Sequence, residues 1–238
     1  MALSNDIRDL ADRSLAELDD CHNYFTDTKA VWRLLQQQVK KKDLRFRIRN
    51  ITTGKTIDQE DLPGLAQHYV TDYLLGSTFQ HFVSLFESFF FDLLQLWLTY
   101  YPRSLSNRQV PFGEILDAPD KDAVTVAIVE RKLNELRYER VADWFAYLDE
   151  IMRLACPASG TIEALAEIKA SRDILVHNKG IVNTVYLSKA GSHARYADGE
   201  RLEIPPAYHE ESWRTIRSVI RELSDAAIMK ATNASLSP

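Results

Sequence analysis

Apolar side chains recur three or four residues apart along most of this chain, the pattern of amphipathic helices. The first such segment spans residues 3–42, with a break or bend expected at residues 24–27. A second spans residues 63–101 and is expected to kink at Gly76. Further helices are predicted at residues 121–139, 142–156, 161–179 and 208–231, with a loop at 102–111 and a frayed tail at 232–238.

Two short stretches depart from the helical pattern. Residues 44–49 alternate apolar and basic side chains, which predicts a strand that residues 52–56 would turn into a hairpin. Residues 194–204 predict a second hairpin that turns at Asp198 and Gly199. We therefore expect one all-α domain, a helical bundle with one or two short β-hairpin insertions. Its parts would be an N-terminal helix and basic hairpin (1–62), a core bundle (63–231) and the tail.

Composition and charge narrow the class of protein. A hydrophobic content of 45% and a charged content of 26% are those of an ordinary globular chain. Two cysteines cannot form a disulfide framework, and the polar, acidic first 20 residues lack the apolar core of a signal peptide, so a cytoplasmic location is expected. The net charge of −5 argues against a general nucleic-acid coating protein but allows a nuclease with a small basic cleft.

The most apolar run, residues 79–101, is predicted to be the central helix of a bundle and not a membrane span. Polar side chains interrupt it at roughly helical spacing, and bilayer hydrocarbon would penalise such a stripe. They are Gln80, Ser84, Glu87, Asp92 and Gln95.

The strongest chemical signal is the stretch R-D-I-L-V-H-N-K-G at residues 172–180, which ends at a glycine expected to stop a helix. It supplies a cation for a phosphate, a proton carrier and an anion to orient that carrier, the groups needed to cleave a phosphodiester without a metal ion. Arg172 falls inside an apolar stripe, where a charge costs several kcal/mol unless it is paired or faces a polar cleft. That stripe consists of Leu165, Ile168, Leu175 and Val176.

Asp173 and His177 are four residues apart on the predicted helix and can face each other, so the carboxylate could fix the imidazole tautomer. Arg172 and His177 lie about 140° apart on a regular helix, so they do not share a face. Two copies of the helix facing each other across a dimer would resolve this difficulty. The alternative is purely structural: an imidazole that caps the helix and an arginine paired with Glu87 or another buried acid.

The pattern Arg172-Asp173-x-x-x-His177 resembles the RxxxxH signature of the HEPN superfamily, an all-α fold. The continuation at residues 177–183, H-N-K-G-I-V-N, resembles the H-N-x-G-I-V stretch of several bacterial HEPN families. Glu87, within F-E-S-F, is similar to the acidic position on an early core helix of such proteins. The resemblance covers roughly residues 63–231.

The resemblance implies a homodimeric, metal-independent endoribonuclease without a cofactor, its two motif helices at the interface. Attack by a 2′-hydroxyl would leave a 2′,3′-cyclic phosphate. His177 would move protons, Arg172 would bind the phosphate, Asp173 and Asn178 would position them, and Glu87 would support them. Such proteins often act as toxins or anti-phage effectors restrained by an antitoxin or other partner. Lys179 stands where toxins paired with nucleotidyltransferase antitoxins carry tyrosine, which argues against that pairing.

Two further hypotheses stay open beside the ribonuclease. One is a catalytically silent HEPN module that binds nucleotide, RNA or a partner protein, and the other is a purely structural helical bundle. A candidate RNA-guiding patch consists of Lys40, Lys41, Lys42, Arg45, Arg47 and Arg49. Its alternative is a solvated hairpin that resists edge-to-edge pairing. The other five histidines show no metal-ligand spacing, so no metal site is predicted.

Overall fold

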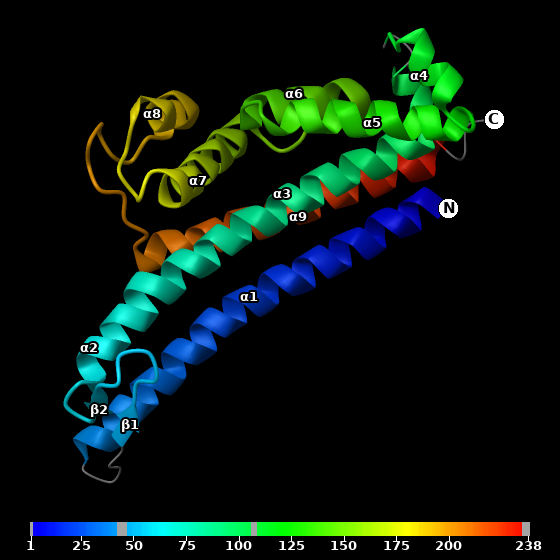
Figure 1. The fold of residues 1–238 in the computed structure, drawn as a ribbon. Helices are drawn as coiled ribbons and strands as arrows, with labels where there is room; N and C mark the ends of the chain where they lie inside the picture. Colours follow the sequence, from blue (N-terminus) through cyan, green and yellow to red (C-terminus); the bar gives the residue numbers. More distant parts are fainter. Residues whose placement is uncertain (1, 42–46, 106–108, 235–238) are drawn as a thin grey trace.

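The computed structural model describes residues 2–41, 47–105 and 109–234, and most of them are helical (Figure 1). Three long helices lie side by side as one layer, namely α1 (Ala2–Lys40), α3 (Leu75–Tyr100) and α9 (Pro206–Ala234). The predicted all-α class is thus confirmed. The shorter elements of the second layer are α4 (Phe112–Asp117), α5 (Lys121–Arg137), α6 (Val141–Met152), α7 (Ser159–His177) and α8 (Thr184–Ala190), with 3₁₀ turns at Pro102–Leu105 and Gly191–His193.

Helix α3 is the centre of the core because its apolar side chains repeat on nearly all sides. Phe79, Phe82 and Phe86 are at most 2% exposed and belong to one apolar core that also includes Leu3, Ile7 and other residues of α1. Further along α3, Phe90 and Phe91 pack against the Trp144 ring of α6, Phe90 tilted and Phe91 edge-to-face. Helix α1 therefore belongs to the same core as the predicted bundle. Burial on this scale is the main favourable term in folding.

The helix that contains α3 begins earlier, at α2 (Leu62–Ala66), and passes through an eight-residue π-helical segment, η1 (Gln67–Leu74). The predicted kink at Gly76 was wrong, since the departure from α geometry lies before that residue. The combined helix, Leu62–Tyr100, is long and apolar enough to cross a membrane, and 56% of its most apolar window is buried inside the protein. Buried core helices pass the same test of length and composition.

Helix α1 runs without interruption from Ala2 to Lys40, so the break predicted at residues 24–27 was wrong. Phe25, within that stretch, is 5% exposed, and its ring centroid lies 4.4 Å from that of His209. It also belongs to a small apolar cluster with Leu74 and Leu75. This packing favours an unbroken helix where the local sequence suggested a bend.

The first predicted hairpin is present as β1 (Arg47–Arg49) paired antiparallel with β2 (Thr56–Asp58). The part of its first strand at residues 44–46 lies outside the described residues. The second predicted hairpin was wrong: residues 194–204 turn at Gly199, with a φ of +81°, but form a loop. This loop pairs through a single antiparallel bridge between Arg201 and Ile181. The last helix reaches Ala234, so it extends into the predicted tail.

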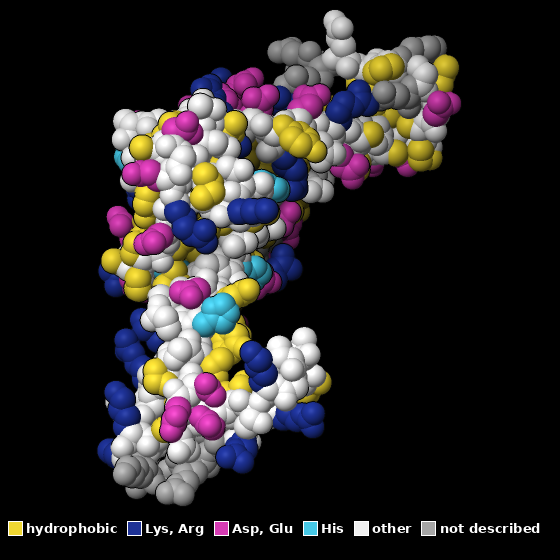
Figure 2. Space-filling view, turned by 60° about the vertical axis from the view of Figure 1, so that its left-hand side comes forward, with side chains coloured by type: hydrophobic (Ala, Val, Ile, Leu, Met, Phe, Trp, Pro, Cys, Tyr) yellow, Lys and Arg dark blue, Asp and Glu magenta, His cyan; other side chains and the backbone are white. Residues whose placement is uncertain are grey.

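An arm projects beyond the body of the molecule, formed by residues 26–41 and 47–74 (Figures 1 and 2). It contains the last turns of α1, the hairpin, α2 and η1. Figure 2 shows Lys and Arg side chains along the arm, with Asp and Glu side chains gathered in one place on the face in view. The arm carries seven basic and five acidic residues, whereas the whole chain carries 29 basic and 34 acidic ones. The arm is thus locally basic in an acidic chain.

Candidate active site

Helix α7 places the predicted motif along one wall of a cavity of about 580 Å³. Arg172, Asp173, His177 and Asn178 all line this cavity, and Glu87 reaches it from α3. Arg172 and His177 thus contribute to one cavity even though they leave α7 in different directions. The other described residues lining it are Phe91, Asn134, Arg137, Tyr138, Glu139, Trp144, Lys169, Ala170, Ile174, Asn183, Val185, Tyr186 and Lys189.

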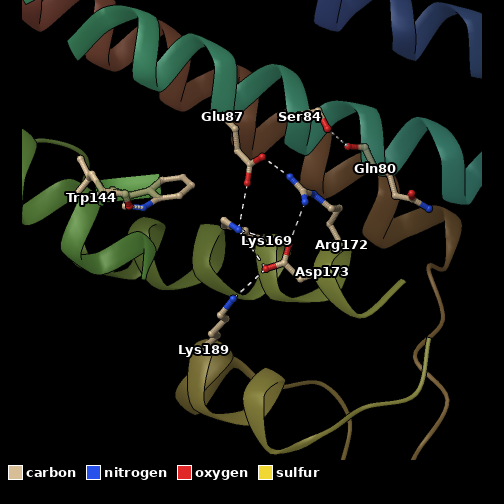
Figure 3. Close-up of polar contacts among 9 residues, drawn as sticks. Gln80, Ser84, Glu87, Trp144, Lys169, Arg172, Asp173 and Lys189 are labelled. Atoms are coloured by element: carbon tan, nitrogen blue, oxygen red, sulfur yellow. Dashed lines mark hydrogen bonds and ion pairs between the residues drawn. The ribbon is translucent and has the colours of Figure 1, made fainter. Parts of the chain in front are cut away.

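The Arg172 guanidinium is held by two carboxylates (Figure 3). Its Nη2 donates to Glu87, and its Nη1 donates to Asp173 Oδ1 at 3.1 Å. The side chain is 16% exposed. Its Nε is buried and has no hydrogen-bond partner among the described residues. The charge inside the apolar stripe is therefore explained by Glu87, the acid that the sequence had singled out.

Two lysines complete the ion network around these carboxylates (Figure 3). Lys169 Nζ lies 3.2 Å from Glu87 Oε1 and 3.2 Å from Asp173 Oδ2, and 5.4 Å from the centroid of the Trp144 ring. Lys189, on α8, places its Nζ 3.1 Å from Asp173 Oδ2. We call this set the open network; its members are Glu87, Lys169, Arg172, Asp173 and Lys189.

Asp173 contacts three cations and makes no hydrogen bond to His177, so the predicted orientation of the imidazole by this carboxylate was wrong. Partial burial by itself raises the pKa of the Asp173 carboxyl, but Lys169 and Lys189 outweigh it and hold that pKa below its usual range. Asp173 is consequently an anion that organises the cations of the cavity.

His177 is the last residue of α7, and its side chain is exposed. It makes no hydrogen bond or ion pair with any other described residue, so both ring nitrogens are accessible to a ligand. Asn178 follows it as the C-cap and donates from Nδ2 to the carbonyl of Ile181 at 2.5 Å. Gly180 has a φ of +78°, which side chains rarely adopt, and its N–H bonds to the carbonyl of Ile174. The predicted helix stop at Gly180 is confirmed.

Charges around the cavity leave a small positive excess. Of the described residues that line it, four are cationic, namely Arg137, Lys169, Arg172 and Lys189, and three are anionic, namely Glu87, Glu139 and Asp173. Protonation of His177 would add another positive charge. A cavity with this balance suits a ligand of low negative charge, such as one phosphodiester.

The sequence did not identify Lys169 and Lys189 as parts of the site. Lys169 precedes Asp173 by four residues, and this spacing could have marked it as a partner on the same helix. Lys189 is 16 residues from Asp173 and meets it only because α8 packs against α7. No local pattern carries that information.

A second ion network lies on another face of α7, and we call it the closed network. Its centre is Glu167, which is 3% exposed and accepts from Ser171 at 2.7 Å, Tyr186 at 2.8 Å and Arg195 at 3.0 Å. Tyr208 donates to the other carboxylate oxygen at 2.5 Å, and the Arg195 guanidinium lies 3.4 Å from the Tyr208 ring centroid. The closed network ties α7, α8, α9 and the loop before α9 together.

The predicted RNA-guiding patch lies on the arm, away from the residues that line the cavity. Lys40, Lys41, Arg47 and Arg49 are exposed, and none of these four lines the cavity. Lys42 and Arg45 lie outside the described residues. If this patch contacts RNA, it does so at a distance from the motif.

Comparisons of the chain with protein-family models, curated proteins and solved structures gave no match. Across residues 2–41, 47–105 and 109–234, no group of three or more His, Cys, Asp or Glu side chains could hold a metal ion.

Proposed function

We propose that the protein is a metal-independent endoribonuclease of the HEPN type. The observation that carries this proposal is that Arg172, Asp173 and His177 line one cavity, in which His177 has no partner among the described residues. A free imidazole is available for proton transfer, and the cations beside it can neutralise a phosphate. RNA is the substrate that this chemistry fits, because only RNA carries a 2′-hydroxyl next to the scissile phosphate.

In the proposed reaction the imidazole of His177 accepts the proton of the 2′-hydroxyl. The resulting oxygen attacks the neighbouring phosphorus, and the bond from phosphorus to the 5′-oxygen breaks. A protonated imidazole returns a proton to that oxygen, so the products are a 2′,3′-cyclic phosphate and a 5′-hydroxyl. Arg172, with Lys169 and Lys189 nearby, would stabilise the charge on the phosphoryl oxygens. Glu87 and Asp173 would hold these cations in place.

One imidazole per cavity is too few for simultaneous acid and base catalysis, so we propose a homodimer whose two motif helices face each other. Apolar side chains exposed near the end of α7 support self-association there. Val176 is 48% exposed, Ile181 is 38% exposed and Val185 is 56% exposed. By its family resemblance the enzyme would serve as a cytoplasmic toxin or anti-phage effector, restrained by an antitoxin or another regulatory protein.

A silent binding module is the second candidate, and a specific observation favours it. Arg172 is engaged by both Glu87 and Asp173, and Asp173 contacts cations in place of His177. Such an arrangement can bind an anion without orienting a base. In that case phosphate-containing ligands would occupy the cavity and no bond would be cleaved.

The test is cleavage of total cellular RNA by the purified protein in EDTA. Arg172→Ala and His177→Ala should abolish cleavage, and Arg172→Lys should keep the fold if the alanine variant loses it. Lys179→Ala is the matched control, because Lys179 is exposed two residues from His177 and does not line the cavity. Cleavage by the wild type and the control alone, with cyclic-phosphate ends, supports the ribonuclease. If the wild-type protein binds RNA but leaves it intact, the silent binding module is favoured.

A further inference from the structure

A second hollow lies in the arm, between α1 and the segment formed by α2 and η1. Its volume is about 200 Å³, smaller than the roughly 300–1,000 Å³ of small-molecule pockets. Such a groove suits one segment of a longer ligand better than an enclosed metabolite. The residues lining it are Lys29, Trp32, Arg33 and Gln36 of α1, with Pro63, Ala66, Gln67, Val70 and Thr71 opposite.

The described side chains that line this groove include two cations and no acid that would neutralise them. Lys29 and Arg33 both line it. Neither forms an ion pair with a described residue, although Lys29 Nζ lies 5.4 Å from the centroid of the Phe25 ring. Among the described residues, no acidic side chain lines the groove. The nearest acid along η1, Asp72, is 3.6 Å from His68 and is exposed. Two unpaired cations in one groove fit a ligand that carries repeated negative charges.

Aromatic rings lie beside these cations. Trp32 lines the groove, and its ring centroid is 6.2 Å from that of Tyr69, which is 41% exposed. His68 lies 5.3 Å from Tyr69, and Tyr73 is 65% exposed. Cations interleaved with accessible rings are the arrangement by which proteins bind single-stranded nucleic acid, with phosphates on the cations and bases on the rings.

The backbone of this wall is itself unusual. Gln67, Val70 and Thr71 belong to the π-helical segment η1, and π-helical turns are rare and frequent at functional sites. Beyond the groove, Arg47 and Arg49 extend the basic surface over the hairpin. The arm therefore combines a groove, unpaired cations and accessible rings at a place remote from the residues of the cavity.

We propose that this groove binds single-stranded RNA, with Lys29 and Arg33 on successive phosphates and a base stacked on Trp32. The choice of RNA rests on the proposed function; the preference for a single-stranded polyanion rests on the groove alone. The arm would then hold the substrate at a second point, so that long RNA binds more tightly than RNA short enough to reach only the cavity.

The experiment measures binding of a fluorescent, unstructured uridine oligonucleotide by anisotropy over a range of salt concentrations. All proteins carry His177→Ala, so that the RNA stays intact. Lys29→Gln with Arg33→Gln should lower the slope of log affinity against log salt by about 1.4, since each phosphate contact on a single strand contributes about 0.7. The matched control is Arg8→Gln with Arg221→Gln, an equal change of charge at two exposed positions outside the arm.

Trp32→Ala should weaken binding by about 5- to 150-fold, and Trp32→Phe should retain most of the affinity because it keeps a ring for stacking. Equal salt slopes in the groove variant and its control would overturn the proposal, as would preferential binding of double-stranded RNA. If the groove variant loses binding but the wild-type protein cleaves no RNA, the ribonuclease proposal is contradicted and the RNA-binding groove is supported. If the wild-type protein cleaves RNA but the groove variant binds it as tightly as the control, the ribonuclease proposal is supported and the groove proposal is contradicted.

Discussion

Helix α7 carries two ion networks that differ in how completely their polar groups are satisfied. In the closed network, Glu167 accepts four hydrogen bonds and its side chain is 4% exposed. In the open network, Glu87 and Asp173 are about one-fifth exposed, and the buried Nε of Arg172 lacks a partner among the described residues. All five members of the open network line the large cavity together with the unpartnered His177, whereas Tyr186 is the one described residue of the closed network that reaches it.

This difference in satisfied polar groups assigns a structural role to the closed network and a chemical role to the open network, although both include residues of α7. A buried carboxylate whose acceptor sites are filled has nothing left to offer a ligand, and its partners fix the geometry of three helices and a loop. A partly exposed network that includes a donor without a hydrogen-bond partner can exchange one of its contacts for a ligand. Stability should therefore depend mainly on the closed network, and ligand chemistry on the open one.

The largest expected effect on stability is that of Glu167→Ala. This change leaves Arg195 half-buried without its counter-charge, and breaking a buried pair costs about 3–5 kcal/mol. The matched control is Glu163→Ala on the same helix, where an exposed pair with His193 should contribute almost nothing. Urea unfolding measures both. Equal losses in the two variants would remove the distinction between the networks.

Acid should also destabilise the fold through His209, whose ring nitrogen Nε2 lies 2.8 Å from Thr78 Oγ1 of α3. His209, next to Tyr208, is fully buried, and burial lowers its pKa to about 4, with His22 adding to the effect. Between pH 6.5 and 4, His209 is protonated in the unfolded chain and neutral in the folded chain. The free energy of unfolding should therefore be fully present above pH 6.5 and fall by roughly 3 kcal/mol as the pH approaches 4.

The variant His209→Gln should flatten this dependence, which unfolding at a series of pH values would show. Asp173, whose pKa is lowered mainly by Lys169 and Lys189 against the effect of burial, acts in a different window. Its contribution is present above the ordinary carboxyl pKa and is lost only as the pH falls further. An unfolding free energy that stays level down to pH 4 in the wild type would contradict the assignment of His209.

A smaller effect is expected from Tyr208→Phe. The change removes the hydroxyl that donates to Glu167 and keeps the ring against which Arg195 packs. A buried acceptor that loses its donor costs roughly 1–3 kcal/mol. Tyr196→Phe is the control, because its hydroxyl makes only an exposed bond to the carbonyl of Glu203. Thermal unfolding should separate the two, and RNA cleavage should be the same in both.

The smallest change in stability is expected from Lys189→Ala. Asp173 would still contact Lys169 and Arg172, so the free energy of unfolding should move by less than about 1 kcal/mol. Binding of RNA, by contrast, should lose about 0.7 from its salt slope if Lys189 contacts a phosphate. Lys179→Ala provides the comparison. If Lys189→Ala and Lys179→Ala give equal slopes of log affinity against log salt, Lys189 does not contact a phosphate of the RNA.

Most of the fold followed from the sequence because helical periodicity is local. The errors arose where tertiary contacts overrule local signals. Residues 24–27 look like a break, but Phe25 is buried beside Leu74, Leu75 and His209, and α1 continues through it without interruption. Residues 194–204 look like a hairpin, but Arg195 turns toward Glu167, and the loop follows that contact in place of a cross-strand partner.

The sequence predicted part of the candidate site, because the motif residues lie close together in the chain. Arg172, His177 and the supporting Glu87 were identified from the motif and from one misplaced charge in an apolar stripe. Their mutual arrangement was not, since Asp173 faces two lysines, one of them on a helix that the sequence did not predict. The closed network escaped notice because Glu167, Tyr186, Arg195 and Tyr208 share no motif and meet only in the folded chain.

The most direct test of the cavity as a catalytic site is the rate at which the protein cleaves a defined single-stranded RNA in EDTA, measured for wild type, His177→Ala and Lys179→Ala. We predict a loss of about 10²- to 10⁴-fold for His177→Ala alone, with its unfolding free energy within about 0.5 kcal/mol of wild type. Equal cleavage by all three proteins, or no cleavage by any of them, would contradict the assignment of this cavity as a catalytic site.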